Sequence, residues 1–246
     1  MSDEKIVTAA MLVIGDEILS GRTKDKNIGF VADYLTGMGI DLNEVRIVSD
    51  DKAAIIEAVN ALRSRYDYVF TTGGIGPTHD DITAESISEA FGVPCEPHPT
   101  AMREMAEFYA SRNMEFTEAR QRMARTPKGA ELIDNPVSKA PGIRMENVHI
   151  MAGVPNIMQA MMDAIAPTLK GGQKILSQTV DCPHGEGTVG GPLGDIQQAH
   201  PDAMIGSYPR YFDGKFSTQI VVRARQENIV MAAIEDVKKM LQQLKT

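Results

Sequence analysis

A glycine-rich turn that joins a buried strand directly to a helix limits this chain to a small number of folds. Residues 66–70 (YDYVF) are aromatic and β-branched, as buried strands are, and residues 84–91 have the pattern of a helix. The turn between them, residues 71–83, reads TTGGIGPTHDDIT. Strands and helices also alternate through the first two thirds of the chain, which predicts a mostly parallel sheet covered by helices on both faces.

The chain has two predicted domains. We expect a large α/β domain over residues 1–171, ending where two consecutive glycines interrupt the pattern. The rest of the chain has the pattern strand, helix, two strands and helix, with an Asp-Gly hairpin signal at residues 213–214. Residues 172–246 therefore predict a second, smaller α+β domain.

The turn has the features of a phosphate site. Gly73, Gly74 and Gly76 permit backbone angles that other residues avoid and let main-chain amides come close to a ligand, while Pro77 stiffens the exit. Unpaired N–H groups and the positive end of the following helix favour an anion there.

Two adjacent carboxylates, Asp80 and Asp81, follow the turn. Beside a phosphate they would repel it unless a cation stood between them, and a divalent metal ion is the simplest such cation. On a regular helix their side chains would diverge by roughly 100°, so we expect one to bind metal and the other to cap or orient. The alternative is a plain structural turn in which Thr78 and Asp81 form a capping box. The strand, glycines, proline and acid pair together favour the ligand site.

Composition and charge argue against two classes of partner. The formal net charge is -8, and the basic residues are scattered, so no basic stripe is available for a nucleic acid. The apolar run at residues 6–14 follows acidic residues and lacks a cleavage pattern, which predicts a first strand rather than a signal peptide. No window approaches the roughly 20 apolar residues that cross a bilayer. We expect a cytoplasmic protein without nucleic-acid or membrane partners.

Three loops should meet at one edge of the predicted sheet. In an open parallel sheet, ligands bind outside the carboxyl ends of the strands, where the strand order reverses. That rule brings together the loop of residues 15–27, the glycine turn, and residues 153–156. Asp16 and Glu17 lie in the first of these loops, although a solvated loop pair is the alternative for them.

Four motifs resemble a known family. They are IGDEILSG at residues 14–21 with Asn27, TTGGIGPTHDD at 71–81, APG at 140–142 and AGVP at 152–155. In this order they resemble the amino-terminal region of CinA-type competence/damage-inducible proteins, in the molybdopterin-binding superfamily shared with MoaB, MogA and one domain of eukaryotic FAD synthase. The resemblance covers nearly the whole chain. It implies a three-layer α/β/α fold with a small α+β domain, commonly as a homo-oligomer.

The resemblance also implies an activity. For CinA-type and FAD-synthase-type members it implies a metal-dependent pyrophosphatase for a nucleotide diphosphate such as ADP-ribose or FAD, with a divalent metal of the cobalt, magnesium or manganese type and potassium. The molybdopterin branch implies binding of a pterin phosphate and adenylyl transfer. A third possibility is a non-catalytic nucleotide-binding regulator. The deamidase domain of full-length CinA lies beyond the resemblance, so deamidation is not expected.

Carried over position by position, the motifs supply the candidate site residues. The candidates for substrate binding are Gly73, Gly74, Gly76, Pro77, Thr78, Asn27, Gly153 and Pro155. The candidates for the metal are Asp80 and Asp81, and those for the catalytic base are Asp16, Glu17 and Asp81. Hydrolysis of a pyrophosphate requires an aligned water and neutralised phosphate oxygens, which metal, amides and a carboxylate base supply together.

Overall fold

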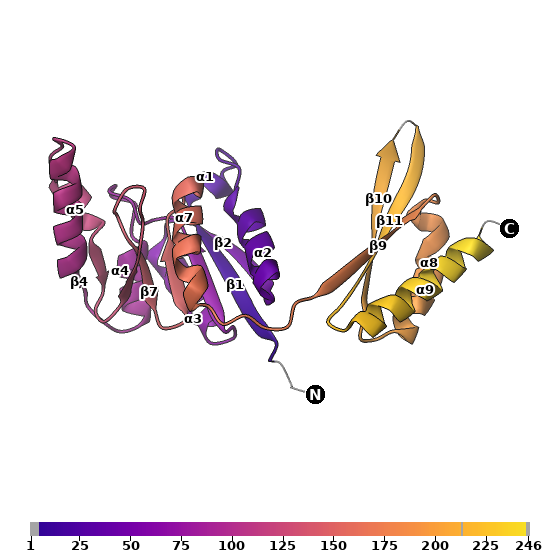
Figure 1. The fold of residues 1–246 in the computed structure, drawn as a ribbon. Coiled ribbons are helices and arrows are strands. Elements are labelled where there is room, and N and C mark those ends of the chain that lie inside the picture. Colours follow the sequence, from indigo (N-terminus) through magenta and orange to yellow (C-terminus); the bar gives the residue numbers. More distant parts are fainter. Residues whose placement is uncertain (1–4, 213, 245–246) are drawn as a thin grey trace. The chain divides into compact units, whose positions relative to one another are not determined.

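The computed structural model describes residues 5–212 and 214–244. The chain forms two compact units, one ending at Gly172 and one beginning at Gln173 (Figure 1). Each unit has its own buried core. No helix of the described residues is long and apolar enough to span a membrane.

The first unit is built on a six-stranded sheet with strand order β2-β1-β3-β8-β7-β6. The strands are β1 (Val7–Ile14), β2 (Ile40–Val48), β3 (Tyr68–Thr72), β6 (Glu131–Ile133), β7 (Gly142–Met145) and β8 (Val148–Met151). The first four in the spatial order run parallel, β7 pairs antiparallel with β8, and β6 at the edge pairs antiparallel with β7. This arrangement confirms the predicted α/β class with a mostly parallel sheet.

Helices cover both faces of this sheet. The covering helices are α2 (Asn27–Met38) and α7 (Pro155–Ile165) on one face and α3 (Lys52–Arg63) and α4 (Thr83–Ala90) on the other. The unit also contains α1 (Asp16–Leu19), α5 (Pro99–Ser111), α6 (Glu118–Arg122) and the 3-10 turn η1 (Ala166–Thr168). A separate two-stranded ribbon pairs β4 (Cys95–Pro97) with β5 (Arg125–Pro127). The helix after the glycine turn begins at Thr83, close to the predicted start.

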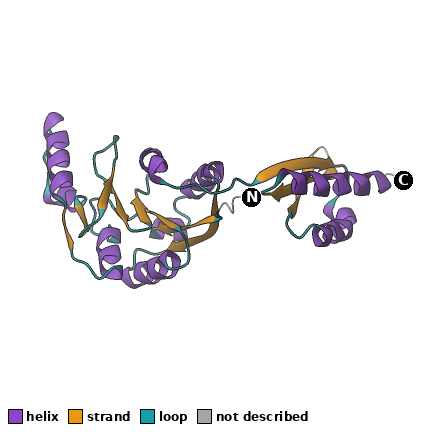
Figure 2. Cartoon of the chain, turned by 60° about the horizontal axis from the view of Figure 1, so that its bottom comes forward, coloured by secondary structure: helices purple, strands orange, loops and turns teal. Residues whose placement is uncertain are grey.

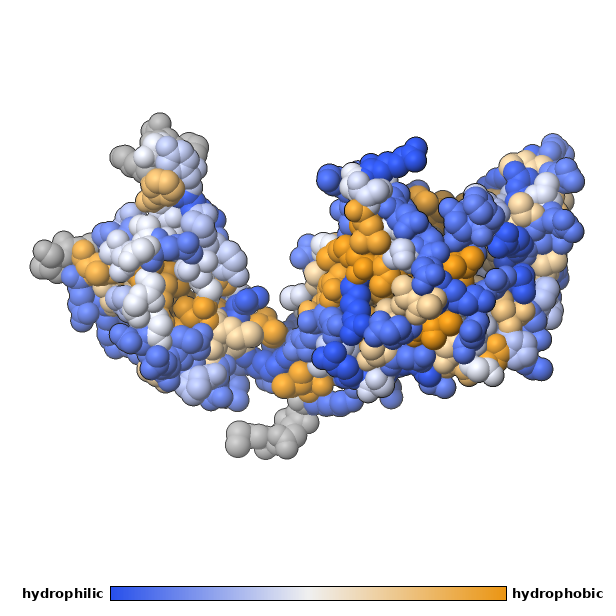
Figure 3. Space-filling view, turned by 180° about the vertical axis from the view of Figure 1, so that it is seen from behind, coloured by the Kyte–Doolittle hydropathy of each residue, from blue (hydrophilic) through white to orange (hydrophobic). Residues whose placement is uncertain are grey.

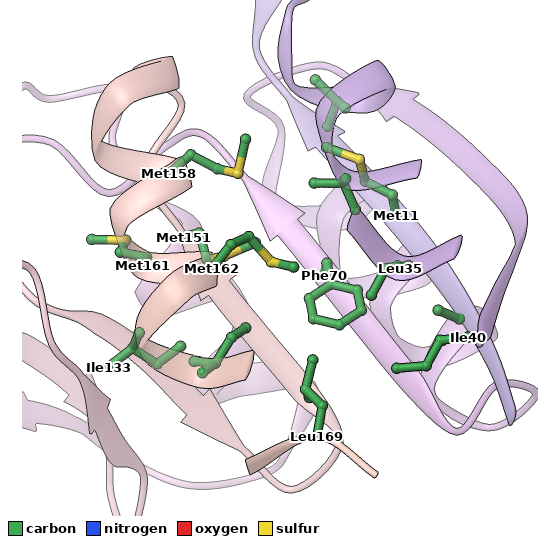
Figure 4. Close-up of a cluster of buried hydrophobic side chains, with 14 of the residues drawn as sticks. Met11, Leu35, Ile40, Phe70, Ile133, Met151, Met158, Met161, Met162 and Leu169 are labelled. Carbon is green, nitrogen blue, oxygen red and sulfur yellow. The ribbon is translucent and has the colours of Figure 1, made fainter. Parts of the chain in front are cut away.

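The two faces of β1 pack against different helices, which gives the unit three layers of helices, sheet and helices. Alternate side chains of a strand point to opposite faces, so Met11 packs with α2 and α7 while Leu12 packs with α3 and α4. Every residue of β1 except Thr8 is buried. Figure 4 shows the first of these two clusters, where methionines of α7 meet Phe70. Burial on both faces fixes β1 as an internal strand of the sheet.

The second unit is a three-stranded antiparallel sheet with two helices (Figure 2). Its elements are β9 (Leu176–Cys182), α8 (Glu186–Ala199), β10 (Met204–Phe212), β11 (Lys215–Ala224) and α9 (Glu227–Gln243). The expected hairpin joins β10 to β11. Gly214 in its turn has a φ of +73°, whereas Asp213 lies outside the described residues. The unit is the smaller α+β body that the sequence predicts.

A buried histidine makes the first unit sensitive to acid. His149 on β8 is 2% exposed, and its ring stacks on Phe70 at 5.2 Å between centroids. Neither ring nitrogen hydrogen-bonds to a described residue. Burial, aided by the charge of Arg144, lowers the pKa of His149 to about 4. The folded unit therefore holds this imidazole neutral.

Acidification should destabilise the unit through His149. The unfolded residue has a pKa near 6.5, so between this value and about pH 4 the unfolded chain binds a proton that the folded chain does not. The contribution of neutral His149 to the free energy of unfolding is therefore complete above pH 6.5. About 2 to 3 kcal/mol of it is lost between pH 7 and pH 4.5. Urea unfolding of the wild type and of His149→Phe at the two pH values measures this loss. An equally steep loss in the variant would contradict the assignment.

Candidate functional site

The loops that follow β1, β3 and β8 meet at the carboxyl edge of the parallel sheet. The chain leaves β1 for β2 on one side and then crosses to β3 on the other, so the strand order reverses beside β1. A cavity of about 500 Å³ lies at this edge. Its lining includes residues 73–77 of the turn, Glu17, Asp81 and residues 152–155. The strand-order rule therefore located the cavity correctly.

Hydrogen bonds from Thr83 hold the glycine turn in place. Its hydroxyl donates to the Gly73 carbonyl oxygen at 3.0 Å, and its amide donates to the Gly74 carbonyl oxygen at 3.0 Å. Gly73 and Gly74 have φ values of +104° and +65°. The turn thus contacts α4 through its carbonyl oxygens and lines the cavity with its other side.

The amides of this turn are available to a ligand. Gly74, Ile75 and Gly76 line the cavity, and their N–H groups donate no hydrogen bond to another described residue. Helix α7 begins at the same cavity, with Pro155 at its first turn and no side chain capping its amino end. Free amides and a helix amino terminus are the usual elements of an anion site.

The structure separates the two adjacent aspartates. Asp81 lines the cavity, and its Oδ2 accepts hydrogen bonds from the Thr78 amide at 2.8 Å and the Thr78 hydroxyl at 2.5 Å. Asp80 lines neither this cavity nor a smaller compartment that lies beside it, and its side chain is 60% exposed. Interaction with the Thr78 side chain, and then with its own backbone amide, lowers the pKa of Asp80.

Thr78 and Asp81 form a closed turn rather than a helix cap. The amide of Asp81 donates back to the Thr78 carbonyl oxygen at 3.3 Å. Helix α4 begins two residues later, with Ile82 at the capping position and no side-chain cap. Thr78 itself does not line the cavity. Its contacts instead fix the position of the Asp81 carboxylate against Gly76.

The two acidic residues of the first loop, Asp16 and Glu17, also differ in their position relative to the cavity. Both are exposed, but Glu17 lines the large cavity, whereas Asp16 lines neither this cavity nor the smaller compartment beside it. The amide of Asp16 donates to Asp50 Oδ2 at 2.9 Å, at the start of the short helix α1. The two candidate bases at the cavity are therefore Glu17 and Asp81.

A smaller compartment of about 200 Å³ shares lining residues with the large cavity. Both are bordered by Glu17, Thr23, Gly153 and Pro155. Asn27, at the start of α2, lines the smaller one, and its Nδ2 donates to the Gly153 carbonyl oxygen at 2.8 Å. This bond ties α2 to the loop after β8.

Sequence reasoning missed part of the lining. Asn135 is 2% exposed, borders the large cavity and accepts from the amides of Val137 and Ser138. Its Nδ2 donates to the Ala140 carbonyl oxygen at 2.7 Å. The only signal in the sequence was its place in a proline-rich loop next to the APG motif.

Two arginines also lie beside the turn. Arg122 and Arg125 border a small recess together with Gly74, Ile75, Gly76 and Asp81. Arg125 pairs with Glu85 at 2.5 Å, whereas Arg122 forms no ion pair with a described residue. The sequence places both on a polar stretch with no visible link to the turn.

The carboxylates at the cavity are few. Among the described residues, no three His, Cys, Asp or Glu side chains are grouped as a metal-binding cluster. Glu17 and Asp81 line the cavity together. One or two carboxylates completed by substrate phosphates are a common arrangement for Mg²⁺ at phosphate sites. The carboxylates of Glu17 and Asp81 therefore fit a divalent ion that binds together with a phosphate ligand.

Comparison with known proteins agrees with this architecture. Residues 10–171 match the family described as probable molybdopterin binding domain, and residues 174–246 match the middle domain of FAD synthase. A protein of Aeropyrum pernix is 33% identical over 94% of this chain and 90% of its own length. A CinA-like protein of a Sulfurihydrogenibium species is 36% identical, over 62% of this chain and 40% of its own length.

Among solved structures, the protein CinA of Thermoplasma acidophilum, whose function is described as unknown, is similar to the first unit. It is 31% identical, with a TM-score of 0.61, over 66% of this chain and 98% of that one. The motifs, the sheet order and these matches agree with one another. This chain belongs to the family of probable molybdopterin-binding domains, and it is similar to the middle domain of FAD synthase over residues 174–246 and to the protein CinA.

Proposed function

We propose that this protein is a metal-dependent hydrolase that cleaves the diphosphate of a nucleotide such as ADP-ribose or FAD. The observation that carries the proposal is the shared lining of one cavity by free turn amides and by the Asp81 carboxylate. Its volume of about 500 Å³ lies in the usual range of small-molecule sites, roughly 300–1,000 Å³. The match of the second unit to FAD synthase motivates FAD as a substrate to test.

Charge balance supports a phosphate ligand that brings a cation. The turn amides and the amino end of α7 favour negative charge, while Glu17 and Asp81 oppose it. A diphosphate with a divalent ion satisfies both sets of groups. The carboxylate that would hold the ion is that of Asp81. When bound, such an ion neutralises phosphate charge and lowers the pKa of a coordinated water.

The main-chain amides and side chains at the cavity have distinct proposed roles. The turn amides of Gly74, Ile75 and Gly76 hold phosphate oxygens in place as charge develops on them. Thr78 keeps the Asp81 carboxylate in one orientation through two hydrogen bonds. Glu17, whose carboxylate is not fixed in this way, is the proposed base that accepts a proton from the attacking water.

Purified protein with ADP-ribose or FAD and Co²⁺, Mg²⁺ or Mn²⁺ should release AMP. We expect product only when a divalent ion is present, because the carboxylates would otherwise repel the diphosphate. Chromatography with and without EDTA measures the release, and addition of potassium tests the monovalent requirement. No AMP with any substrate and metal pair would refute the hydrolase.

A second candidate function is binding of a pterin phosphate with adenylyl transfer, which the match to the probable molybdopterin-binding family favours. Pterin fluorescence that copurifies with the protein, or ATP-dependent adenylylation of a pterin, would support it. A non-catalytic regulator differs from both, because its ligand would bind tightly while Asp80→Ala and Asp81→Ala left any background rate unchanged.

We also propose a homo-oligomer. Edge strand β2 carries Val45 and Ile47, which are 38% and 40% exposed. Apolar residues reach the surface in patches (Figure 3). Light scattering on the purified protein measures its mass, and a monomer at all concentrations would exclude the assembly.

A further inference from the structure

We infer that strand β9 of the second unit pairs with β9 of a second copy of this chain, so that two three-stranded sheets become one continuous sheet. β9 lies at an edge of its sheet, next to β11. Among the described residues, no backbone hydrogen bond joins β9 to a segment other than β11. The inference is independent of the hydrolase, and it deepens the proposed homo-oligomer by naming a contact surface separate from β2.

The opposite edge strand, β10, is protected against such pairing. The amide of Ile205 donates to Oε1 of Gln197 on α8 at 2.8 Å, so the backbone of Ile205 points away from β11. Alternate residues of a strand direct their backbone groups to the same edge. Pro209, four residues further along β10, therefore lies at an outward position and has no N–H group to offer. A proline and cover from a helix are two devices by which natural edge strands avoid pairing.

Strand β9 has no such protection. It is seven residues long, contains no Lys, Arg or Pro, and pairs with β11 without a register shift. Residues 176–179 and Asp181 are exposed. Residues 173–246 contain eight Lys and Arg and eight Asp and Glu, so the net charge of this unit does not oppose a second copy. A long, exposed edge strand of this kind is a template for pairing with another chain.

The hydrogen-bond ladder shows which backbone groups of β9 face outward. Ile205 lies opposite Val222 of β11, and because the Ile205 backbone points outward, the Val222 backbone points the other way, toward β9. Val222 lies opposite Gln178, whose backbone groups are therefore bonded to β11. The alternate residues of β9 direct their N–H and C=O groups away from the sheet, and these residues are Ser177, Thr179 and Asp181.

The sequence of β9 matches itself about Thr179. This residue is the middle of the strand, so a two-fold axis there pairs the whole of β9 antiparallel with its copy. Ser177 then lies opposite the partner's Asp181, which places a hydroxyl opposite a carboxylate and keeps the like charges apart. Leu176, which is 42% exposed, gains the partner's Val180 as a diagonal neighbour on the same face. An unrelated strand would lack this match, which favours a second copy as the partner.

Thr179→Pro tests the contact. Proline removes an N–H group that faces outward, and the ladder to β11 does not use that group, so the unit should stay folded as edge strands with proline do. Light scattering should give the variant half the mass of the wild type at the same concentration. Thr179→Val is the matched control, because valine keeps both the N–H group and the β-branched shape, and it should keep the wild-type mass. Circular dichroism checks that both variants are folded.

Thr179→Cys tests the same contact without weakening it. A short bismaleimide should join two copies of this variant, which then run as a dimer on a denaturing gel. The wild type contains Cys95 and Cys182 and controls for cross-links at these residues. Thr188→Cys is the matched control, since Thr188 is exposed on α8, which contacts the opposite edge strand β10. We expect neither control to form the dimer band.

The outcomes separate the contact from the assembly. If the wild type is an oligomer and folded Thr179→Pro has the same mass, β9 is not the contact and the homo-oligomer stands. Equal cross-linking of Thr179→Cys and Thr188→Cys leads to the same conclusion. A monomeric wild type overturns both, and a monomer that copurifies with another protein bound through β9 assigns the edge to a foreign strand. None of these measurements depends on AMP release, so the hydrolase is tested separately.

Discussion

Asp81→Asn should lower kcat/KM for ADP-ribose by roughly 100- to 1,000-fold, the range found when a group that stabilises developing charge is lost. Asparagine retains a side-chain oxygen that can accept from the Thr78 amide and hydroxyl, so the turn should keep its shape. The change removes the negative charge that the proposed metal requires. Steady-state rates across a range of metal concentrations measure the loss, with a raised metal requirement as the specific sign.

Asp80→Asn is the control for this experiment. Its carboxylate is mostly exposed and borders neither cavity. We expect kcat/KM within about threefold of the wild type, the size of effect that a screened surface charge produces. A larger loss in Asp80→Asn than in Asp81→Asn would exchange the two roles and contradict the geometry of the site.

Gly73→Ala should destabilise the first unit by about 4 kcal/mol. Its φ of +104° is unfavourable for any residue with a Cβ atom. A Cβ atom placed there would also lie 2.1 Å from the carbonyl oxygen of Ile14, the last residue of β1. Because backbone cannot move aside as a side chain can, the strain adds an overpacking cost to the conformational one. Urea unfolding followed by circular dichroism measures the loss.

Gly92→Ala separates the two costs. Gly92 also has a positive φ, +67°, but a Cβ atom there would meet nothing within 4 Å. Only the conformational cost applies, about 1 kcal/mol. Equal losses in the two variants would show that the contact with Ile14 is relieved cheaply. Ligand affinity of Gly73→Ala, measured where the variant is folded, should fall as well, because the turn would have to shift.

The fold was predictable because its signals are local. Aromatic and β-branched runs alternate with helical runs, and that order dictates a parallel sheet with helices on both faces. The antiparallel β7, which the pattern does not reveal, is only four residues long and takes its place through pairing with β8 and β6. Short strands depend on such partners more than on their own sequence.

The position of the site was also predictable, but its membership was not. The strand-order rule gathers the loops after β1, β3 and β8 without any coordinates. It does not say which side of a loop faces inward. Asp16 and Glu17 are neighbours, yet only Glu17 borders the cavity, because α1 turns the first away. Asn135 enters the lining from a loop with no recognisable motif.

By itself, the sequence determined the fold class, the glycine turn and the edge of the sheet where the three loops meet, since periodicity and glycine spacing act over a few residues. The tertiary structure alone decided that Asp81 rather than Asp80 borders the cavity, and that Asn27 reaches Gly153 across 126 residues. The direction of a side chain depends on the segments packed around it, and segments distant in sequence leave no local trace.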